Sequence, residues 1–203
     1  MNKKILIAII ALALPASAFA DTTVGVGYDN VGVHTGNINA SLPAGKLTIG
    51  KTFDNGYIAG LALTAGSGNG LTYQHAQLAA AKLIPFDGGL FAPEILAGYA
   101  RVGVPSGHVG AAYAGVGIDY LYPVGRHVSL SANAAFGRDF ATQATGFTTS
   151  SGMFYQAGAA VDISGVGPGL VSIGYSYRHL PLSDSGGLTL DTDGVQAAYH
   201  IAF

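Results

Sequence analysis

The sequence predicts an all-β fold: a closed antiparallel transmembrane β-barrel of about ten strands, with eight strands as the alternative. Three observations lead to this prediction. After residue 20, hydrophobic residues alternate with small or polar ones at a period of two, and helical periodicity is absent. Only 10% of the residues are charged, whereas a soluble domain is nearer a quarter charged. Glycine accounts for 31 of the 203 residues, which suits tightly twisted, closely packed strands.

The N-terminus has the features of a cleavable export signal. Two lysines precede an apolar run over 5–14, which is too short to span a bilayer, and residues 18–20 form the small-x-small pattern of a cleavage site. We therefore expect Sec-dependent export and removal of residues 1–20 after Ala20, which leaves 21–203 as one barrel domain. The chain has no cysteine, so disulfides, thiol nucleophiles and a lipid anchor at the cleavage site are excluded. It also has no basic excess to suggest nucleic-acid binding.

The expected strands follow one another along residues 21–203. The first is glycine-rich, the second and third flank the Asp54-Asn55-Gly56 hairpin turn, and the fourth and fifth have no clear apolar face. The last five alternate strictly between apolar residues and small or polar ones. The ten expected strands lie near 22–33, 47–53, 57–65, 71–84, 90–104, 112–122, 128–136, 153–163, 171–178 and 195–203.

The two faces of these strands favour a membrane barrel over a soluble sandwich. One face is apolar and suits lipid; the other carries Ser, Gly, Ala, Gln and Asn with about one charge per strand, which suits a narrow lumen. Short inner turns are expected near 54–56, 85–89, 123–127 and 164–169, and outer loops near 34–45, 67–70, 105–108, 139–151 and 181–193.

Aromatic residues are expected to form two interfacial girdles. The inner girdle comprises Phe53, Tyr57, Phe91, Tyr120, Tyr122 and Phe203. The outer girdle comprises Tyr73, Tyr113, Phe136, Phe140, Tyr155, Tyr175 and Tyr177.

Several segments resemble the small bacterial outer-membrane barrels of the OmpA/OmpX type. The signal peptide, the Gly-Val-Gly-Ile-Asp-Tyr run at 115–120 and the C-terminal segment carry this resemblance, and 171–178 also looks like the penultimate strand of YfaZ-type porin-like proteins. The resemblance implies that the alternating C-terminus is a signal for the barrel-assembly machinery, made of Val195, Ala197, Tyr199, Ile201 and Phe203. Unlike in OmpA, we expect no periplasmic domain after the barrel.

Polar residues on the small-residue faces form the candidate site. We expect a lumenal polar group made of Glu94, Asp119, Asp162, Arg178, Gln196 and His200, with Lys82 as a further cation. Such residues could conduct protons or ions, or gate a path. We favour a packed, hydrogen-bonded interior, because narrow barrels fill their lumens with side chains and buried charges need partners.

Two patterns are candidate catalytic sites. His127 and Ser129 are similar to the His-x-Ser of outer-membrane lipid A deacylases, but here the pair begins a strand at an inner turn. His179, Asp184, Asp191 and Asp193 gather near the last outer loop, as in an omptin-like protease or a cation site, but a solvated acidic loop accounts for them more simply. We expect no catalytic residue, no metal and no cofactor.

The sequence thus predicts a monomeric, non-enzymatic barrel in the cell outer membrane, with a structural or surface-interaction role. Its expected partners are outer-membrane lipid and lipopolysaccharide, and the barrel-assembly machinery and periplasmic chaperones during biogenesis. A narrow porin or channel for small solutes or ions is the alternative hypothesis, and a lipid-modifying enzyme is the third.

Overall fold

The computed structural model describes residues 22–105, 107–182 and 188–203, so the predicted signal peptide lies outside the described residues. These residues form ten long strands and one short one, and no helix among them is long and apolar enough to cross a membrane. The long strands are β1 (Thr22–Thr35), β2 (Ile38–Thr52), β3 (Tyr57–Gly68), β4 (Leu71–Lys82), β6 (Gly89–Val104), β7 (Gly107–Pro123), β8 (Val128–Ala144), β9 (Met153–Val166), β10 (Gly169–Pro181) and β11 (Thr189–Ala202). The short strand is β5 (Ile84–Phe86).

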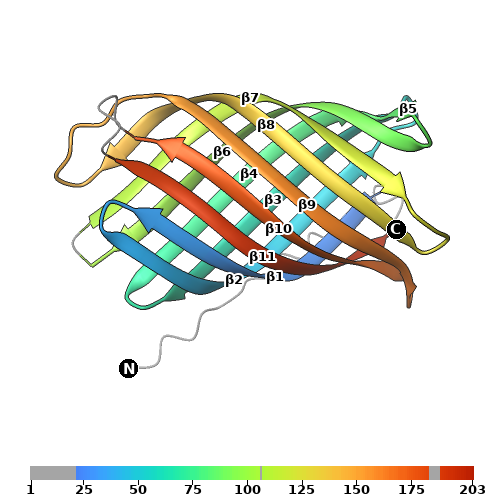
Figure 1. Cartoon of the computed structure of the whole chain (residues 1–203), viewed down its shortest axis with the longest axis horizontal. Helices are drawn as coiled ribbons and strands as arrows, with labels where there is room; N and C mark the ends of the chain where they lie inside the picture. Colours follow the sequence, from blue (N-terminus) through green and yellow to red (C-terminus); the bar gives the residue numbers. More distant parts are fainter. Residues whose placement is uncertain (1–21, 106, 183–187) are drawn as a thin grey trace.

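The strands form one closed antiparallel barrel (Figure 1). Each long strand pairs with its neighbours in sequence, β1 pairs with β11, and β6 pairs with β4, so no long strand is left at an edge. Closure satisfies the backbone hydrogen-bonding groups that an open edge would expose. The prediction of ten strands is confirmed, and the eight-stranded alternative is wrong.

The connections divide the barrel into two ends. We call the end with the connections 53–56, 83–88, 124–127 and 167–168 the turn end; Thr22 and Phe203 also lie there, joined by a 2.9 Å backbone hydrogen bond. The opposite end, with the connections 36–37, 69–70, 105–106, 145–152 and 182–188, is called the loop end.

Two tight hairpins show why the chain reverses where it does. Asn69 and Gly70 both have positive φ, 52° and 78°, and Asp87 and Gly88 have φ of 47° and 76°. Positive φ at both central residues is the type I′ geometry, whose twist matches that of paired strands. The turn predicted at 85–89 is therefore narrower than expected, since β5 pairs with the start of β6 and leaves only Asp87 and Gly88 between them.

The prediction of a long outer loop at 34–45 is wrong. β1 continues to Thr35 and β2 begins at Ile38, so only two residues connect them. The reason is that Leu42 and Ala44 are buried inside the barrel, 0% and 3% exposed, so this stretch gains from remaining paired and inward-facing. The loop predicted at 139–151 also begins later than expected, because β8 extends to Ala144.

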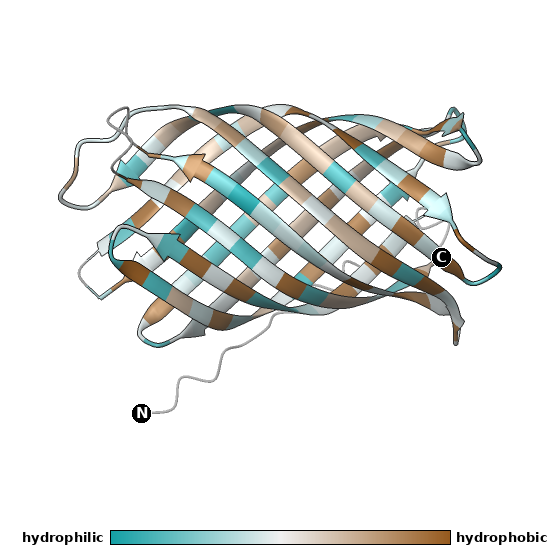
Figure 2. Cartoon of the chain, in the orientation of Figure 1, coloured by the Kyte–Doolittle hydropathy of each residue, from teal (hydrophilic) through white to brown (hydrophobic). Residues whose placement is uncertain are grey.

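Hydrophobic and less hydrophobic residues follow one another along the strands (Figure 2), and large hydrophobic side chains in the middle of the barrel are exposed on its outer surface. Large hydrophobic side chains there are 47–65% exposed: Val26, Leu78, Ile95, Val116, Ile118, Phe136, Ile173 and Val195. Such a continuous exposed apolar surface would make a soluble protein aggregate, whereas it matches the hydrocarbon of a bilayer.

Apolar side chains fill the lumen in the half nearest the loop end. We call this group the apolar plug, and its members that are 0% exposed are Val33, Leu42, Ala100, Val102, Ala111, Phe154, Leu180, Leu182 and Leu190. Tyr73 and Tyr113, which the sequence placed in the outer girdle, point inward at the base of this plug and are 3% and 0% exposed. Strand alternation explains the correction, because Tyr113 shares its face with the lumenal residues Gly115 and Asp119.

Candidate functional site: the polar lumen

Below the apolar plug the lumen becomes polar in two layers. The middle layer lies against the plug and contains Asp29, Tyr73, His75, Gln77, Gln156, Arg178 and Gln196, together with Lys46. The turn-side layer lies nearer the turn end and contains Glu94, Asp119, Asp162 and His200.

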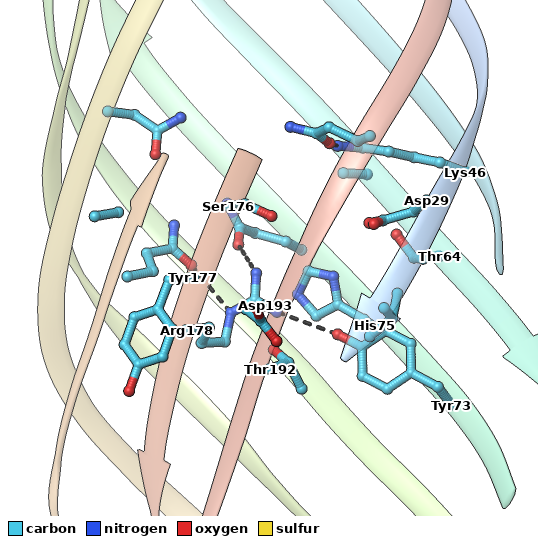
Figure 3. Close-up of a pocket in the computed structure, with 17 residues that line it drawn as sticks. Asp29, Lys46, Thr64, Tyr73, His75, Ser176, Tyr177, Arg178, Thr192 and Asp193 are labelled. Carbon is cyan, nitrogen blue, oxygen red and sulfur yellow. Dashed lines mark hydrogen bonds between the residues drawn. The ribbon is translucent and has the colours of Figure 1, made fainter. Parts of the chain in front are cut away.

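Arg178 on β10 is the centre of the middle layer (Figure 3). Its Nε donates to Gln156 Oε1 at 3.1 Å, Nη1 to the Tyr73 hydroxyl at 3.4 Å, and Nη2 to Gln77 Oε1 at 3.4 Å. Its guanidinium carbon also lies 5.4 Å from the centroid of the Tyr113 ring. Among the described residues these three hydrogen-bond partners of the guanidinium are neutral, and a cation–π contact adds to the stabilisation.

Lys46 and Asp29 complete the charge of this layer. The Lys46 ammonium donates to Gln196 Oε1 from across β1. Asp29 is only 8% exposed, and its Oδ1 atom has no hydrogen-bond partner within the part of the chain that the structure describes. Among the described residues, the two ion pairs are His–Asp pairs on the outer surface, so neither cation of the middle layer is paired with a carboxylate.

Aromatic residues support the middle layer from β4 and β7. The Tyr113 hydroxyl lies 2.6 Å from His75 Nε2 and donates to Gln77 Oε1 at 2.9 Å. The ring of His75 lies beside those of Tyr73 and Tyr113, with centroid separations of 6.4 and 6.2 Å. These contacts fix the position of Gln77, which also accepts from Arg178.

A carboxyl pair lies in the turn-side layer. Glu94 on β6 and Asp119 on β7 lie within electrostatic range of each other and border a cavity of about 280 Å³. Gly117 makes room for the pair, because a Cβ there would lie 2.6 Å from Glu94 Oε1.

His200 and Asp162 lie elsewhere in the same layer. His200 Nδ1 is 3.5 Å from the Thr48 hydroxyl, and the two side chains meet over Gly25, the cross-strand partner of both. A Cβ at Gly25 would lie 2.3 Å from each, so a glycine is required for this close approach. Asp162, which is 8% exposed, lies on β9 within electrostatic range of His200.

The six residues predicted as one lumenal group thus lie on lumen-facing positions but in separate places. Arg178 and Gln196 belong to the middle layer, Glu94 pairs with Asp119, and Asp162 lies near His200. The prediction that Lys82 is a further lumenal cation is wrong. Lys82 is exposed, and its ammonium lies 4.8 Å from the Tyr57 ring centroid.

Sequence reasoning missed several residues of the middle layer, namely Asp29, Lys46, His75, Gln77 and Gln156. A signal for Asp29 exists in its spacing, since it follows Gly25 and Gly27 on the small-residue face of the first strand. The second strand is expected to start near residue 47, which leaves Lys46 outside both this strand and the loop predicted at 34–45.

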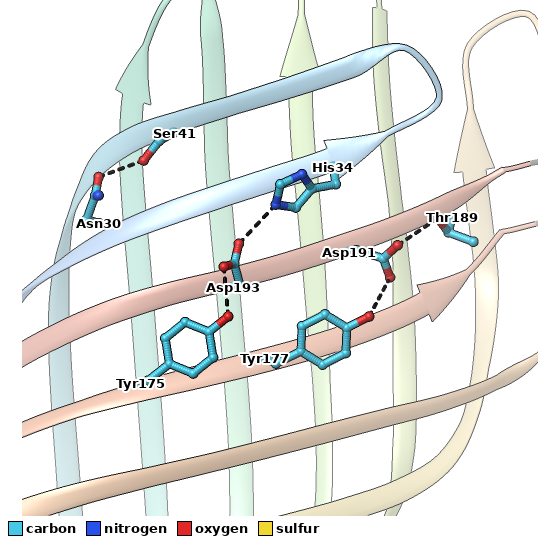
Figure 4. Close-up of polar contacts among 8 residues, drawn as sticks. All are labelled: Asn30, His34, Ser41, Tyr175, Tyr177, Thr189, Asp191 and Asp193. Atoms are coloured by element: carbon cyan, nitrogen blue, oxygen red, sulfur yellow. Dashed lines mark hydrogen bonds and ion pairs between the residues drawn. The ribbon is translucent and has the colours of Figure 1, made fainter.

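A second polar group, the outer polar cluster, lies on the outside of the barrel near the loop end (Figure 4). Asp193 Oδ1 is 3.0 Å from His34 Nε2, and Asp193 Oδ2 accepts from the Tyr175 hydroxyl at 2.8 Å. The Asp191 carboxylate lies 2.5 Å from His179 Nδ1. It also accepts hydrogen bonds from the hydroxyls of Thr189 at 3.0 Å and Tyr177 at 3.4 Å.

The sequence expected these acidic residues in a solvated loop, and that expectation is wrong for Asp191 and Asp193. Both lie within β11, and His179 lies within β10, whereas Asp184 lies outside the described residues. Within residues 22–105, 107–182 and 188–203, no group of three or more His, Asp or Glu side chains is arranged to hold a metal ion.

The two halves of the His127 and Ser129 pattern have different neighbours. The His127 ring lies beside Gly165 at the turn end, where a Cβ on Gly165 would be 3.2 Å from its Nδ1. Ser129 lies inside β8, opposite Asp162 of β9.

A scan against known protein families and a search of curated proteins find no match for this sequence. Among solved structures, the chain is similar to Neisserial surface protein A, with 9% identity, coverage of 91% of this chain and 98% of that chain, and a TM-score of 0.42. It is similar to the NanC porin, with 11% identity, coverage of 90% and 100%, and a TM-score of 0.49. It is also similar to Ail, the attachment invasion locus protein of Yersinia pestis, with 14% identity, coverage of 89% and 97%, and a TM-score of 0.34. The likeness to YfaZ-type proteins stays a prediction.

Proposed function

We propose that residues 21–203 form a monomeric, non-enzymatic outer-membrane β-barrel with a closed lumen and a structural or surface-interaction role. The observation that carries this proposal is the apolar plug. Side chains such as Leu42, Val102 and Leu190 are 0% exposed in the loop-end half of the lumen, so that half has no wetted path. What the barrel presents outside is then its loop end, including the long connection 145–152.

The outer surface supports a membrane location. Exposed apolar side chains surround the middle of the barrel, and polar residues of the outer polar cluster lie towards the loop end. We place the turn end in the periplasm, because short turns and the C-terminal Phe203 lie there. In this orientation the alternating residues from Val195 to Phe203 are the proposed signal for the barrel-assembly machinery. Lipid and lipopolysaccharide would contact the apolar surface, and periplasmic chaperones would carry the exported chain to the membrane.

A location test comes first. We expect the mature protein to fractionate with outer membranes, to need detergent for extraction, and to be cleaved by external protease within 145–152. Recovery of a soluble mature protein from the periplasm would overturn the proposal.

A conductance test addresses the plug. Purified wild-type barrel in planar bilayers is expected to give no steady openings. The double variant Leu42→Gly and Leu190→Gly removes two plug side chains and is expected to open a measurable path. The matched control, Leu78→Gly on the lipid-facing surface, should stay closed, and a heat-sensitive folded band on electrophoresis verifies that each variant is a barrel.

A narrow channel is the second candidate function. The observation that favours it is the pair of cavities, about 140 and 280 Å³, in the middle and turn-side layers. Steady wild-type openings whose selectivity changes in Asp119→Asn or Asp162→Asn would support the channel and contradict a closed barrel.

A further inference from the structure

Two arginines lie on the outer wall of the barrel, in the half nearest the loop end. Arg101 on β6 stands between Ala100 and Val102, which are both 0% exposed inside the lumen, so its own side chain points outward. Arg138 on β8 is exposed, and its neighbour Asp139 is 0% exposed on the lumenal face. After residue 20, the other lysines and arginines lie either in the lumen or at the turn end: Lys46, Arg178, Lys51, Lys82 and Arg126.

Neither of these two guanidinium groups forms an ion pair with a described carboxylate. The two ion pairs among residues 22–105, 107–182 and 188–203 are the His–Asp pairs of the outer polar cluster. Asp139 follows Arg138 in sequence but faces the lumen, where it accepts a hydrogen bond from the backbone amide of Gly152. A charge on the lipid-facing wall of a barrel is unfavourable, so an anion from outside the chain would stabilise both arginines.

Amide side chains lie on both sides of Arg101. Its cross-strand partners are Gln74 on β4 and Gly110 on β7, and Gly110 pairs in turn with Gln143 on β8. Gly110 has no side chain, so only backbone separates Arg101 from Gln143 in this row. His108 Nε2 lies 3.3 Å from Gln143 Oε1 and adds an imidazole at the same place. Guanidinium and amide N–H groups are donors that commonly bind phosphate oxygens.

Arg138, by contrast, has apolar neighbours. Phe136 and Phe140, two residues away on either side along β8, are 58% and 49% exposed, and its cross-strand partner Met153 on β9 is 60% exposed. Exposed apolar side chains on this wall face the hydrocarbon of a bilayer. A molecule that covers this surface must present an anionic group to Arg138 and alkyl chains to the residues around it. A phosphorylated lipid has this combination.

The two arginines are close enough to share one lipid headgroup. Arg101 pairs with Gly110, and Arg138 pairs with Ala114, which is four residues further along β7 and bonded on the other side of that strand. With about 3.3 Å per residue and about 4.8 Å between strands, the two Cα atoms are about 16 Å apart. Both long side chains can therefore reach a headgroup that lies over β7 and carries two phosphates.

We propose that the outer wall of β6, β7 and β8 binds a diphosphorylated glycolipid of the outer leaflet, of the lipid A type. One phosphate contacts Arg101 with the amides of Gln74 and Gln143, the other contacts Arg138, and acyl chains lie along Phe136 and its apolar neighbours. This inference rests on the proposed outer-membrane location, with the loop end outside. It gives the lipopolysaccharide contact a defined place on one side of the barrel.

Native mass spectrometry of the purified, folded barrel in a neutral detergent tests this proposal. Diphosphoryl lipid A is expected to bind at one saturable site, and its dephosphorylated form is expected to bind at least tenfold more weakly. Absence of saturable binding, or equal binding of the two forms, would overturn the site. Because binding is measured in detergent, that result would leave the outer-membrane location standing, which the fractionation test decides separately.

Variants then assign the contacts. Arg101→Gln and Arg138→Gln should each weaken binding of diphosphoryl lipid A at least fivefold, and the double variant should lose the preference for the phosphorylated form. The matched control Arg126→Gln, in the turn-end connection 124–127, should leave the affinity unchanged. A heat-sensitive folded band verifies each barrel, and the single variants carry the test if the double variant does not fold. Unchanged affinity in folded Arg101→Gln and Arg138→Gln variants, or an equal loss in Arg126→Gln, would contradict the assignment.

Discussion

Arg178 of β10 donates to the hydroxyl of Tyr73 of β4 across the lumen, over a distance of 3.4 Å and a separation of 105 residues in sequence. This contact connects two walls of the barrel that share no backbone pairing. It also lies where the apolar plug ends and the polar lumen begins, since Tyr73 is almost fully buried. The boundary between the closed and the polar halves is therefore held by side chains from distant strands.

Tyr113→Phe tests the aromatic support of this boundary. The change removes the hydroxyl that contacts His75 and Gln77, and leaves buried polar groups with fewer partners. We expect a loss of about 1–3 kcal/mol in the free energy of unfolding, measured by urea titration in detergent. Tyr122→Phe, on the exposed outer face, is the control and should change this free energy little. Equal effects of the two changes would contradict the role given to Tyr113.

Leu42→Ala tests the apolar plug. Leu42 is 0% exposed, and its truncation is expected to cost about 2–5 kcal/mol in unfolding free energy, because it removes buried apolar contacts and leaves a cavity. Leu47→Ala, five residues along the same strand but on the outer face, should cost clearly less. The same urea titration compares the two, and a smaller loss for Leu42→Ala would contradict a packed plug.

Gly137→Ala tests the close packing of β7, β8 and β9. A Cβ at Gly137 would lie 2.2 Å from the carbonyl oxygen of Ala114 and 2.7 Å from the ring of Phe154. Overpacking of this kind is expected to cost about 1–3 kcal/mol. Gly50→Ala is the matched control, because nothing lies within 4 Å of a Cβ there. Thermal unfolding followed by circular dichroism should therefore show a lower Tm for Gly137→Ala alone.

Tyr175→Phe tests the outer polar cluster. The tyrosine hydroxyl donates to Asp193 at 2.8 Å, but the pair is exposed, so its loss is expected to cost about 1 kcal/mol or less. Tyr28→Phe, at a similarly exposed tyrosine of β1, is the control. Unfolding titrations of both variants measure the difference, and a larger loss in Tyr28→Phe would count against a stabilising role for the Asp193 contact.

The strands of the C-terminal half show how much of the fold could be predicted. Val195, Ala197, Tyr199 and Ile201 alternate with polar or small residues, and the structure places β11 there with Val195 exposed outward. The segment 34–45 shows the limit of such reasoning. It has Gly, Asn and Pro as a loop would, yet it continues two strands, because Leu42 packs into a lumen that only the closed barrel creates.

The candidate site shows the same limit more clearly. The charged residues Asp119, Asp162 and Arg178 could be assigned to the lumen from alternation alone. Their partners could not, because strand tilt and register decide which lumen-facing residues meet. Glu94 thus pairs with Asp119, while Arg178 bonds Gln156, Gln77 and Tyr73 in a layer that also holds Asp29 and Lys46.

The sequence by itself determined that this chain is a barrel with an apolar outside and a small, polar inside, because side-chain direction in a strand depends only on a residue's place in a local repeat. The tertiary structure alone decided that the lumen is divided into an apolar plug and two polar layers. That division arises from contacts between residues of distant strands, and it exists only once β4 and β6, and β1 and β11, close the barrel.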